Sequence, residues 1–174
     1  GFEQLTAVGG DFILQGHDSL NSLAGLEKLI SIGGTMLIAG QNNGLINLHG
    51  LENLSTVGKN LEIFGNNTLV TLTGLEALQT VGGNISVAYN PQLSNCLVDV
   101  ICQQLNIAPD SVVITNNNYG CQSKEAVAIQ CELPEDQCLI NGIVFNNQTE
   151  IDQFSINYPG CREIVGSVDI VGAD

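Results

Sequence analysis

Four glutamates are the residues whose type and spacing come closest to a catalytic or metal-binding set. Glu3, Glu27, Glu52 and Glu76 each follow a Gly-Leu or Gly-Phe pair, at intervals of 24, 25 and 24 residues. Paired carboxylates can hydrolyse glycosidic bonds, but they need two different environments, and these positions are equivalent. We therefore expect each carboxylate to accept hydrogen bonds from the amides of its own turn. Structural calcium is the alternative; no other cofactor is indicated.

The histidines and cysteines give no sign of a nucleophilic or zinc site. His17 and His49 lie at non-equivalent positions in the sequence, and the cysteines form no C-x-x-C pair. An even number of cysteines without metal spacing indicates three disulfides and an oxidising compartment. Paired cysteines leave no thiol to act as a nucleophile. The six are Cys96, Cys102, Cys121, Cys131, Cys138 and Cys161.

Asparagines cluster after glycines, as in Gly65-Asn66-Asn67. Asparagine tolerates left-handed backbone, and its amide can bond neighbouring backbone. We expect an asparagine ladder here rather than an ion or glycan site. Asn66 also begins an N-x-[ST] sequence, which makes it a candidate glycan acceptor in a host that N-glycosylates secreted proteins.

The chain is strongly acidic, with 18 Asp and Glu against four Lys and Arg and a net charge of −14 in 174 residues. This charge repels phosphate backbones and anionic lipid headgroups, which argues against nucleic acid as a partner. No apolar run approaches the roughly 20 residues of a membrane span, so direct membrane insertion is not expected. Any export signal or anchor is expected outside these residues or to have been removed.

A repeat of about 24 residues is the strongest feature of the sequence. The glutamates belong to a Gly-[Leu/Phe]-Glu-x-Leu motif beginning at Gly1, Gly25, Gly50 and Gly74, followed in register by Val or Ile and then Gly. Each unit is too short to bury its own apolar face, so neighbouring units must stack and share a core. The predicted inward pairs are Phe12/Leu14, Met36/Ile38, Leu61/Ile63 and Ile85/Val87.

Parallel strands stacked in this way predict a right-handed parallel β-solenoid, a mainly β fold with short capping helices. A second short strand is expected at 69–72 and its equivalents. The Gly-Gly pairs, such as Gly33-Gly34, are expected to adopt positive φ or to form a bulge.

Beyond Cys96 the apolar spacing becomes helical. It predicts a helix over 95–105 with Asn95 as N-cap, a strand over 111–115 and a second helix over 123–129. These elements would close one end of the solenoid.

The outward positions of the main strands predict a partner-binding patch. Ile13, Leu37 and Phe64 would lie together on an exposed face, and such apolar patches often mark contact surfaces. Glu62 and Gln15 hold outward positions beside them. The alternative is that a loop or a neighbouring domain covers the patch.

The repeat resembles the receptor L domain, the ligand-binding solenoid of insulin- and epidermal-growth-factor-type receptors. The resemblance rests on the four Gly-[Leu/Phe]-Glu-x-Leu units and on the closing segment from Asn90 to Cys131. It covers about 1–131 and is closer to the version found in large secreted surface proteins of Bacteroidetes-type bacteria. The L-x-x-L-x-L-x-x-N pattern of ordinary leucine-rich repeats is not kept.

A second resemblance begins at Cys138, where the sequence through Tyr158 and Cys161 looks like the opening of another such domain. In that family a disulfide joins these two cysteine positions, which implies a Cys138–Cys161 pair. Residues 164–170 then repeat the pattern of the main strands.

The resemblance implies a solenoid over 1–131 that lacks its N-terminal coil and carries a helical, cysteine-rich cap. It implies a linker over 132–137 and the opening of a following domain over 138–174. The parent protein is then expected to be a tandem array of such domains.

The four remaining cysteines allow three connectivities. The pairs Cys96–Cys121 and Cys102–Cys131 are favoured because each would tie the first predicted helix to the second.

These features favour a non-enzymatic binding or adhesion module in a tandem-repeat protein that is extracellular or displayed at the cell surface. Its partner would be a protein or glycan at a cell surface, or an adjacent copy of the domain. A purely structural stalk or filament spacer is the alternative, and a polysaccharide-active β-helix enzyme is a third. The bacterial resemblance also makes Ser19 and Ser111, each in an Asp-Ser-aliphatic sequence, candidate O-glycosylation sites.

Overall fold

The computed structural model describes residues 1–40, 42, 44–132, 137–138, 142–158 and 161–172, without the side chains of 137, 138 and 156. The chain divides into two compact units, Gly1–Val127 and Ala128–Asp174. The predicted linker over 132–137 falls largely outside the described residues. Each unit has β-sheets of its own.

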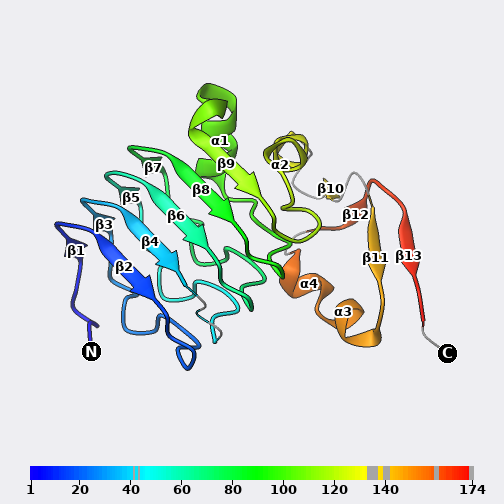
Figure 1. The fold of residues 1–174 in the computed structure, drawn as a ribbon, viewed down its shortest axis with the longest axis horizontal. Coiled ribbons are helices and arrows are strands. Elements are labelled where there is room, and N and C mark those ends of the chain that lie inside the picture. Colours follow the sequence, from blue (N-terminus) through cyan, green and yellow to red (C-terminus); the bar gives the residue numbers. More distant parts are fainter. Residues whose placement is uncertain (41, 43, 133–136, 139–141, 159–160, 173–174) are drawn as a thin grey trace. The chain divides into compact units, whose positions relative to one another are not determined.

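Two parallel sheets form most of the first unit, and their strands run side by side in Figure 1. Each of the four matching sequence segments contributes one strand to each sheet. The four-stranded sheet has the order β1 (Ala7–Val8), β3 (Ser31–Ile32), β5 (Thr56–Val57) and β7 (Thr80–Val81). The five-stranded sheet has the order β2 (Phe12–Gln15), β4 (Met36–Ala39), β6 (Leu61–Phe64), β8 (Ile85–Ala88) and β9 (Val112–Thr115). The prediction of a mainly β fold with short helices is confirmed.

The register of the five-stranded sheet places equivalent residues of successive segments beside one another. Phe12 pairs with Met36, Met36 with Leu61, and Leu61 with Ile85. The side chains of Met36, Leu61 and Ile85 are fully buried. Leucines from the turns between the strands, such as Leu29 and Leu54, are fully buried as well. The core is therefore made of aliphatic rows shared between segments.

The glycines before the main strands serve a different purpose from the one expected. Gly33, Gly58 and Gly82 lie outside the left-handed region, and a Cβ on any of them would collide with the backbone carbonyl of the glycine one segment earlier. Positive φ instead occurs in the Gly-Leu-Glu turns, for example 113° at Gly50. Close approach of backbones, rather than a special dihedral angle, requires glycine before the strands.

The predicted strand over 69–72 is wrong. This stretch forms only an isolated parallel bridge between Thr71 and Asn95. Single backbone bonds connect it to the neighbouring segments, with the Val70 amide donating to the Ile46 carbonyl and the Leu72 amide to the Asn95 carbonyl. The second sheet is built instead from the residues just before the glycines, in β1, β3, β5 and β7.

Helix α1 (Asp99–Ile107) and helix α2 (Lys124–Cys131) follow the β8 strand, with the short helix η1 (Pro109–Ser111) between α1 and β9. The helix predicted over 95–105 begins later than expected. Asn95 does not cap it; Val98 is the N-cap, and the Asn95 side chain accepts a bond from the Leu97 amide. The second helix matches its prediction closely, and Ser123 Oγ accepts from the Ala126 amide at its start.

The second unit contains two small parallel sheets. They are β10 (Gln137–Cys138) with β12 (Glu163–Ile164), and β11 (Ile143–Phe145) with β13 (Val168–Ile170). The connecting helices are α3 (Gln148–Asp152) and α4 (Phe154–Asn157). Phe154 contacts both Phe145 and Tyr158, with ring centroids 5.9 and 5.1 Å away. Strands β12 and β13 occupy the stretch whose sequence repeats the main strand pattern.

Candidate functional site

The outer face of the five-stranded sheet carries the predicted patch. Because strand residues alternate between faces, every second residue of β2, β4, β6, β8 and β9 points away from the core. Two rows result, which the strand register defines. One row is Ile13, Leu37, Glu62, Ser86 and Val113, and the other is Gln15, Ala39, Phe64, Ala88 and Thr115.

The structure brings the predicted apolar residues together and leaves them accessible. Ile13 is 62% exposed, Phe64 is 38% exposed and Leu37 is half-buried. Ala39 and Ala88 point outward on either side of Phe64, yet both are buried. We infer that the Phe64 ring lies over these small residues. Ile13, Leu37 and Phe64 form the apolar surface of this face.

Polar predicted residues border this apolar surface. Glu62 lies between Leu37 and Ser86 in the register, and its carboxylate accepts a bond from Asn60 Nδ2 at 3.1 Å. Gln15 is exposed and pairs with Ala39. Glu62 is therefore held in place while Gln15 faces solvent.

Two exposed apolar residues near this face were missed by the sequence analysis. Val113 ends the first row and is exposed, and Tyr89 follows β8 with a positive φ of 57° and an exposed ring. Aligning the predicted strand over 111–115 with the earlier strands would have found Val113. Tyr89 holds the position that Gly16, Gly40 and Gly65 hold in the earlier segments, where no side chain would be expected.

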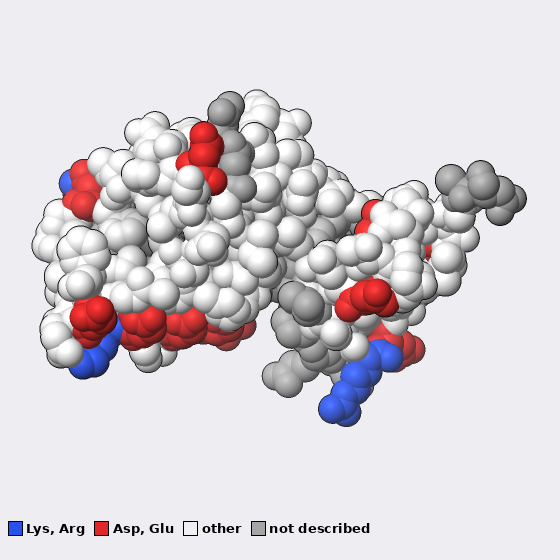
Figure 2. Space-filling view, turned by 90° about the horizontal axis from the view of Figure 1, so that it is seen from below, with Lys and Arg blue, Asp and Glu red and all other residues white. Residues whose placement is uncertain are grey.

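The glutamates of the Gly-Leu-Glu turns bind their own backbone, as expected. The Gly50 amide donates to both carboxylate oxygens of Glu52 at 2.9 Å, and Glu27 and Glu76 make the equivalent bonds within 3.0 Å. Glu3 lies 3.7 Å from the N-terminal ammonium. Figure 2 shows acidic side chains in a row along one edge of the face that it presents. Among the described residues, no group of three or more acidic, His or Cys side chains is placed to hold a metal.

These bonds affect the acidity of the carboxyls. Hydrogen bonds from the amides of Gly25 and of Glu27 itself lower the pKa of Glu27 below 4.5. For Glu52, burial raises the pKa, but bonds from the Gly50 and Glu52 amides and from His49 outweigh it, so the pKa is lowered. His49 Nδ1 lies 3.0 Å from Glu52 Oε1. Glu27 and Glu52 are therefore structural anions at neutral pH.

The same local turn recurs once more without a glutamate. Gly120 has a φ of 95°, and its amide donates to Gln122 Oε1 at 2.6 Å. Cys121, between them, takes the place of the leucine and is fully buried. The sequence analysis missed this copy because Cys and Gln replace Leu and Glu.

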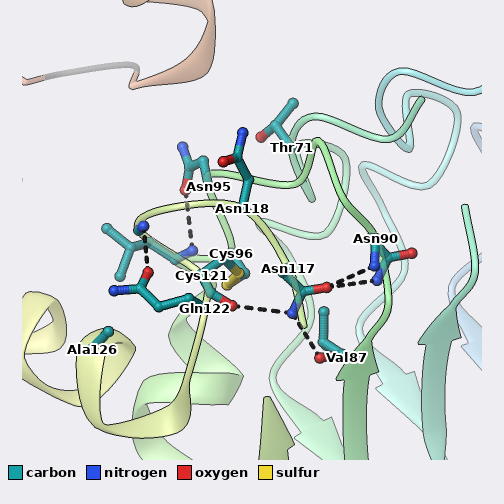
Figure 3. The surroundings of a disulfide bond; sticks show 12 residues. Thr71, Val87, Asn90, Asn95, Cys96, Asn117, Asn118, Cys121, Gln122 and Ala126 are labelled. Carbon is teal, nitrogen blue, oxygen red and sulfur yellow. Dashed lines mark hydrogen bonds between the residues drawn. A yellow bond between two sulfur atoms is a disulfide. The ribbon is translucent and has the colours of Figure 1, made fainter. Parts of the chain in front are cut away.

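A buried asparagine ladder crosses the first unit. Asn42 Nδ2 donates to Asn66 Oδ1, Asn66 to Asn90, and Asn90 to Asn117, at 2.8 to 3.1 Å. Figure 3 shows the end of the ladder, where Asn117 reaches the carbonyls of Val87 and Cys121. The ladder prediction is confirmed. Asn42, Asn66 and Asn117 belong to the asparagine-rich corners for which the ladder was expected, and Asn90 is the member that was not identified.

The prediction that Asn66 accepts a glycan is therefore wrong. It is fully buried, and its Nδ2 donates to the Ile38 and Phe64 carbonyls as well as to Asn90. A glycan would be attached to this nitrogen, so glycosylation of Asn66 is incompatible with the fold.

The two candidate serines differ in their surroundings. Ser19 is exposed in the loop at 16–20, which also contains His17 and bounds a shallow open hollow. The Ser111 hydroxyl donates to the Ala108 carbonyl at 2.7 Å and accepts from Gln104 Nε2. Of the two, only Ser19 is exposed.

A disulfide joins Cys96 to Cys121 beside the end of the ladder (Figure 3), which is the pairing that the sequence favoured. Cys102, Cys131 and Cys161 are also disulfide-bonded, and none of the described cysteines is free. The Cys138 side chain lies outside the described residues. The predicted pairs Cys102–Cys131 and Cys138–Cys161 stay predictions.

No protein-family model, curated protein or solved structure matches this chain. None of the described helices has the length and apolar composition needed to cross a bilayer. The functional interpretation therefore rests on the geometry of the first unit.

Proposed function

We propose that the chain is a non-enzymatic extracellular module that binds a protein partner through the outer face of its five-stranded sheet. The fold that we propose for the first unit is a right-handed parallel β-solenoid of the receptor L domain type. The paired strands at 24- and 25-residue intervals and the shared aliphatic rows support it.

The observation that carries the proposed function is the apolar surface around Phe64. Exposed Ile13 and Phe64 and half-buried Leu37 come from three neighbouring strands. Buried Ala39 and Ala88 keep the surface low around the ring. Interface cores are enriched in aromatic residues, and Phe64 with its aliphatic neighbours fits that feature, with Glu62 as a charged group on the same strand.

A protein partner fits this face better than a glycan. Its centre offers alkyl groups and one aromatic ring, whereas its polar groups, Gln15, Glu62 and Thr115, lie beside the apolar residues. A protein interface of this kind has an apolar core and a polar rim.

The described residues that were weighed as catalytic candidates have other partners. Glu27, Glu52 and Glu76 are each bonded to their own turn amides. Among the described residues, no hydrogen bond links either histidine ring to a serine or cysteine. A serine or cysteine nucleophile activated by histidine would need such a pairing.

The disulfides support the proposed location. Cys96–Cys121 is buried, and such bonds persist in oxidising compartments outside the cytosol. The net charge of −14 suits a soluble domain that avoids nucleic acid and anionic lipid.

A binding assay on intact cells tests the proposal. The labelled chain is compared with the double variant Leu37→Asp/Phe64→Asp, and with Ile30→Asp/Ile46→Asp as the matched control. Ile30 and Ile46 are also exposed but lie outside the five-stranded sheet. We expect the first variant to lose at least about tenfold in affinity, because charge is placed at the apolar centre, and the control to bind as the wild type does.

Circular dichroism must show that both variants are folded. Cells treated with protease should lose binding, whereas cells treated with glycosidases should keep it. Equal binding by the wild type and the Leu37/Phe64 variant would contradict the proposal, and loss only after glycosidase treatment would assign a glycan partner instead.

A further inference from the structure

Glu62 is the only acidic or basic side chain in the two outward rows of the five-stranded sheet. At the equivalent positions the other segments have Ile13, Leu37, Ser86 and Val113, which are apolar or small. Glu62 is half-buried and lies between Leu37 and Ser86 in the register. A single carboxylate is therefore set among the apolar residues of the proposed binding face.

Hydrogen bonds from the neighbouring segment orient this carboxylate. The Asn84 amide donates to Asn60 Oδ1 at 3.0 Å, and Asn60 Nδ2 donates to Glu62 Oε1 at 3.1 Å. Because the first bond needs an acceptor, the amino group of Asn60 is the end that faces Glu62. Asp11 holds the equivalent position before β2 and accepts from the Thr35 amide, but an aspartate has no hydrogen to donate. Asparagine at position 60 thus holds Glu62 in place.

The Glu62 carboxylate has no cationic partner in the described part of the chain. The ion pairs found there involve Glu3 and Glu52 instead. No ion pair joins Glu62 to Lys59, three residues earlier. A carboxylate has about four acceptor positions, and the bond from Asn60 occupies one of them. The other positions have no donor among the described residues.

Phe64 lies on the same face as Glu62, two residues farther along β6, and is 38% exposed. Residues two apart in a strand are separated by roughly 7 Å. A guanidinium group is planar, donates two parallel hydrogen bonds to a carboxylate and also stacks on aromatic rings. One arginine can therefore contact both side chains, whereas a lysine ammonium cannot make the paired bonds.

Burial of this face in an interface makes a cation necessary. A partner that covers Leu37 and Phe64 also removes water from the carboxylate beside them. An unpaired carboxylate buried in this way strongly opposes binding, because its lost hydration is not replaced. A partner with a cation at this point replaces the lost hydration with a charged hydrogen-bonded pair.

We propose that the protein partner presents an arginine whose guanidinium binds the Glu62 carboxylate and stacks on the Phe64 ring. This inference rests on the proposed function of the outer face and names the chemistry that the partner brings to it. The net charge of −14 speeds the approach of any basic surface. A charge pair inside the interface acts differently, because it slows dissociation.

The variant Glu62→Gln in the cell-binding assay tests the need for a cation. Glutamine keeps the size of the side chain and can still accept from Asn60. Its affinity should fall at least about tenfold, mainly through faster dissociation. Asp99→Asn removes the same charge from an exposed position in α1 and should bind within about twofold of the wild type. Unchanged or tighter binding by Glu62→Gln would overturn the proposal, since it would show that the carboxylate is buried without a cation.

Chemical modification of the cells tests the identity of the cation. Phenylglyoxal modifies arginine, and an acetic acid N-hydroxysuccinimide ester acetylates lysine. Phenylglyoxal should reduce wild-type binding to the level of Glu62→Gln and should reduce Glu62→Gln no further, because both changes remove one and the same pair. Acetylation should leave wild-type binding intact. Loss after acetylation alone, or an equal further loss for Glu62→Gln after phenylglyoxal, would contradict an arginine at Glu62.

The variants also separate this inference from the proposed function. If Leu37→Asp/Phe64→Asp loses binding while Glu62→Gln keeps it, the face binds a partner but the arginine is wrong. If Leu37→Asp/Phe64→Asp binds as the wild type does, the proposed function of the face is itself wrong.

Discussion

At the scale of single residues, Asn66 is the best-defined polar group of the core. Its amide nitrogen and oxygen connect Asn42 and Asn90 across neighbouring segments and satisfy the Ile38 carbonyl. No buried side-chain nitrogen or oxygen in the described part of the chain lacks a partner. The ladder fixes the register of the segments, because a one-residue slip would leave several buried polar groups without hydrogen-bond partners at once.

Asn66→Ala should therefore destabilise the fold by about 2–4 kcal/mol, since it leaves polar partners buried and unsatisfied. Urea unfolding monitored by circular dichroism measures this. Asn84→Ala, at an exposed asparagine, is the control and should stay within about 0.5 kcal/mol of the wild type. Equal stabilities for the two variants would contradict the role of the ladder.

The turn glutamates predict a pH dependence. The pKa values of Glu27 and Glu52 are lower in the folded chain than their ordinary value of 4.5. Their stabilisation is therefore complete above that value and is lost as pH falls through the lower folded value. The difference in Tm between the wild type and Glu27→Gln/Glu52→Gln should be largest near neutral pH and should shrink below about pH 4.

Comparing the two proteins at the same pH removes the effect of the acids that titrate in both, and leaves the two charges by which the variant differs. Gln122 shows that an amide can close this turn, so the variant should fold. A difference in Tm that stays constant from neutral to acidic pH would show that the carboxylates are not what stabilises the turns.

At the scale of elements, the close stacking of segments depends on the glycines before the main strands. Gly58 faces the Gly33 carbonyl and Gly82 faces the Gly58 carbonyl, with no room for a Cβ. Gly9 holds the equivalent position in its segment, but a Cβ there would meet no atom within 4 Å. The same residue type thus has two different energetic roles.

Gly58→Ala should cost more than about 2 kcal/mol, because the new methyl group collides with backbone that cannot move independently. Gly9→Ala should change the stability of the monomer by less than about 0.5 kcal/mol. Denaturant unfolding at low concentration and low salt compares the two. Similar losses for both variants would mean that conformation, not contact with the preceding segment, selects glycine here.

The sequence predicts the main strands but not the second sheet. Alternation of apolar and polar residues, as in Leu61-Glu62-Ile63, defines the main strands and their outward residues. The second sheet has strands of only two residues, too short for any alternation to appear. The helix start at Asp99 was missed because Asn95 closes a local turn at Leu97 instead of capping the helix.

At the scale of the whole molecule, the repeat interval predicts which side chains become neighbours, and this includes the candidate face. Ile13, Leu37 and Phe64 could be placed together from their positions in the repeat alone. The exposure of this face could not be predicted from the repeat, since it depends on how Phe64 lies beside Ala39 and Ala88. Tyr89 was not predicted because the equivalent residue in the earlier segments, such as Gly65, is a glycine with a similar positive φ and no side chain.

Hydroxyl-radical footprinting of the chain bound to its cell-surface partner tests the proposed binding face most directly. Leu37 and Phe64 should lose most of their labelling on binding, whereas Tyr119 and Val144, exposed elsewhere, should be labelled as in the free chain. Unchanged labelling of Phe64 in the complex, with protection at Val144 instead, would contradict the assignment of the outer face as the binding surface.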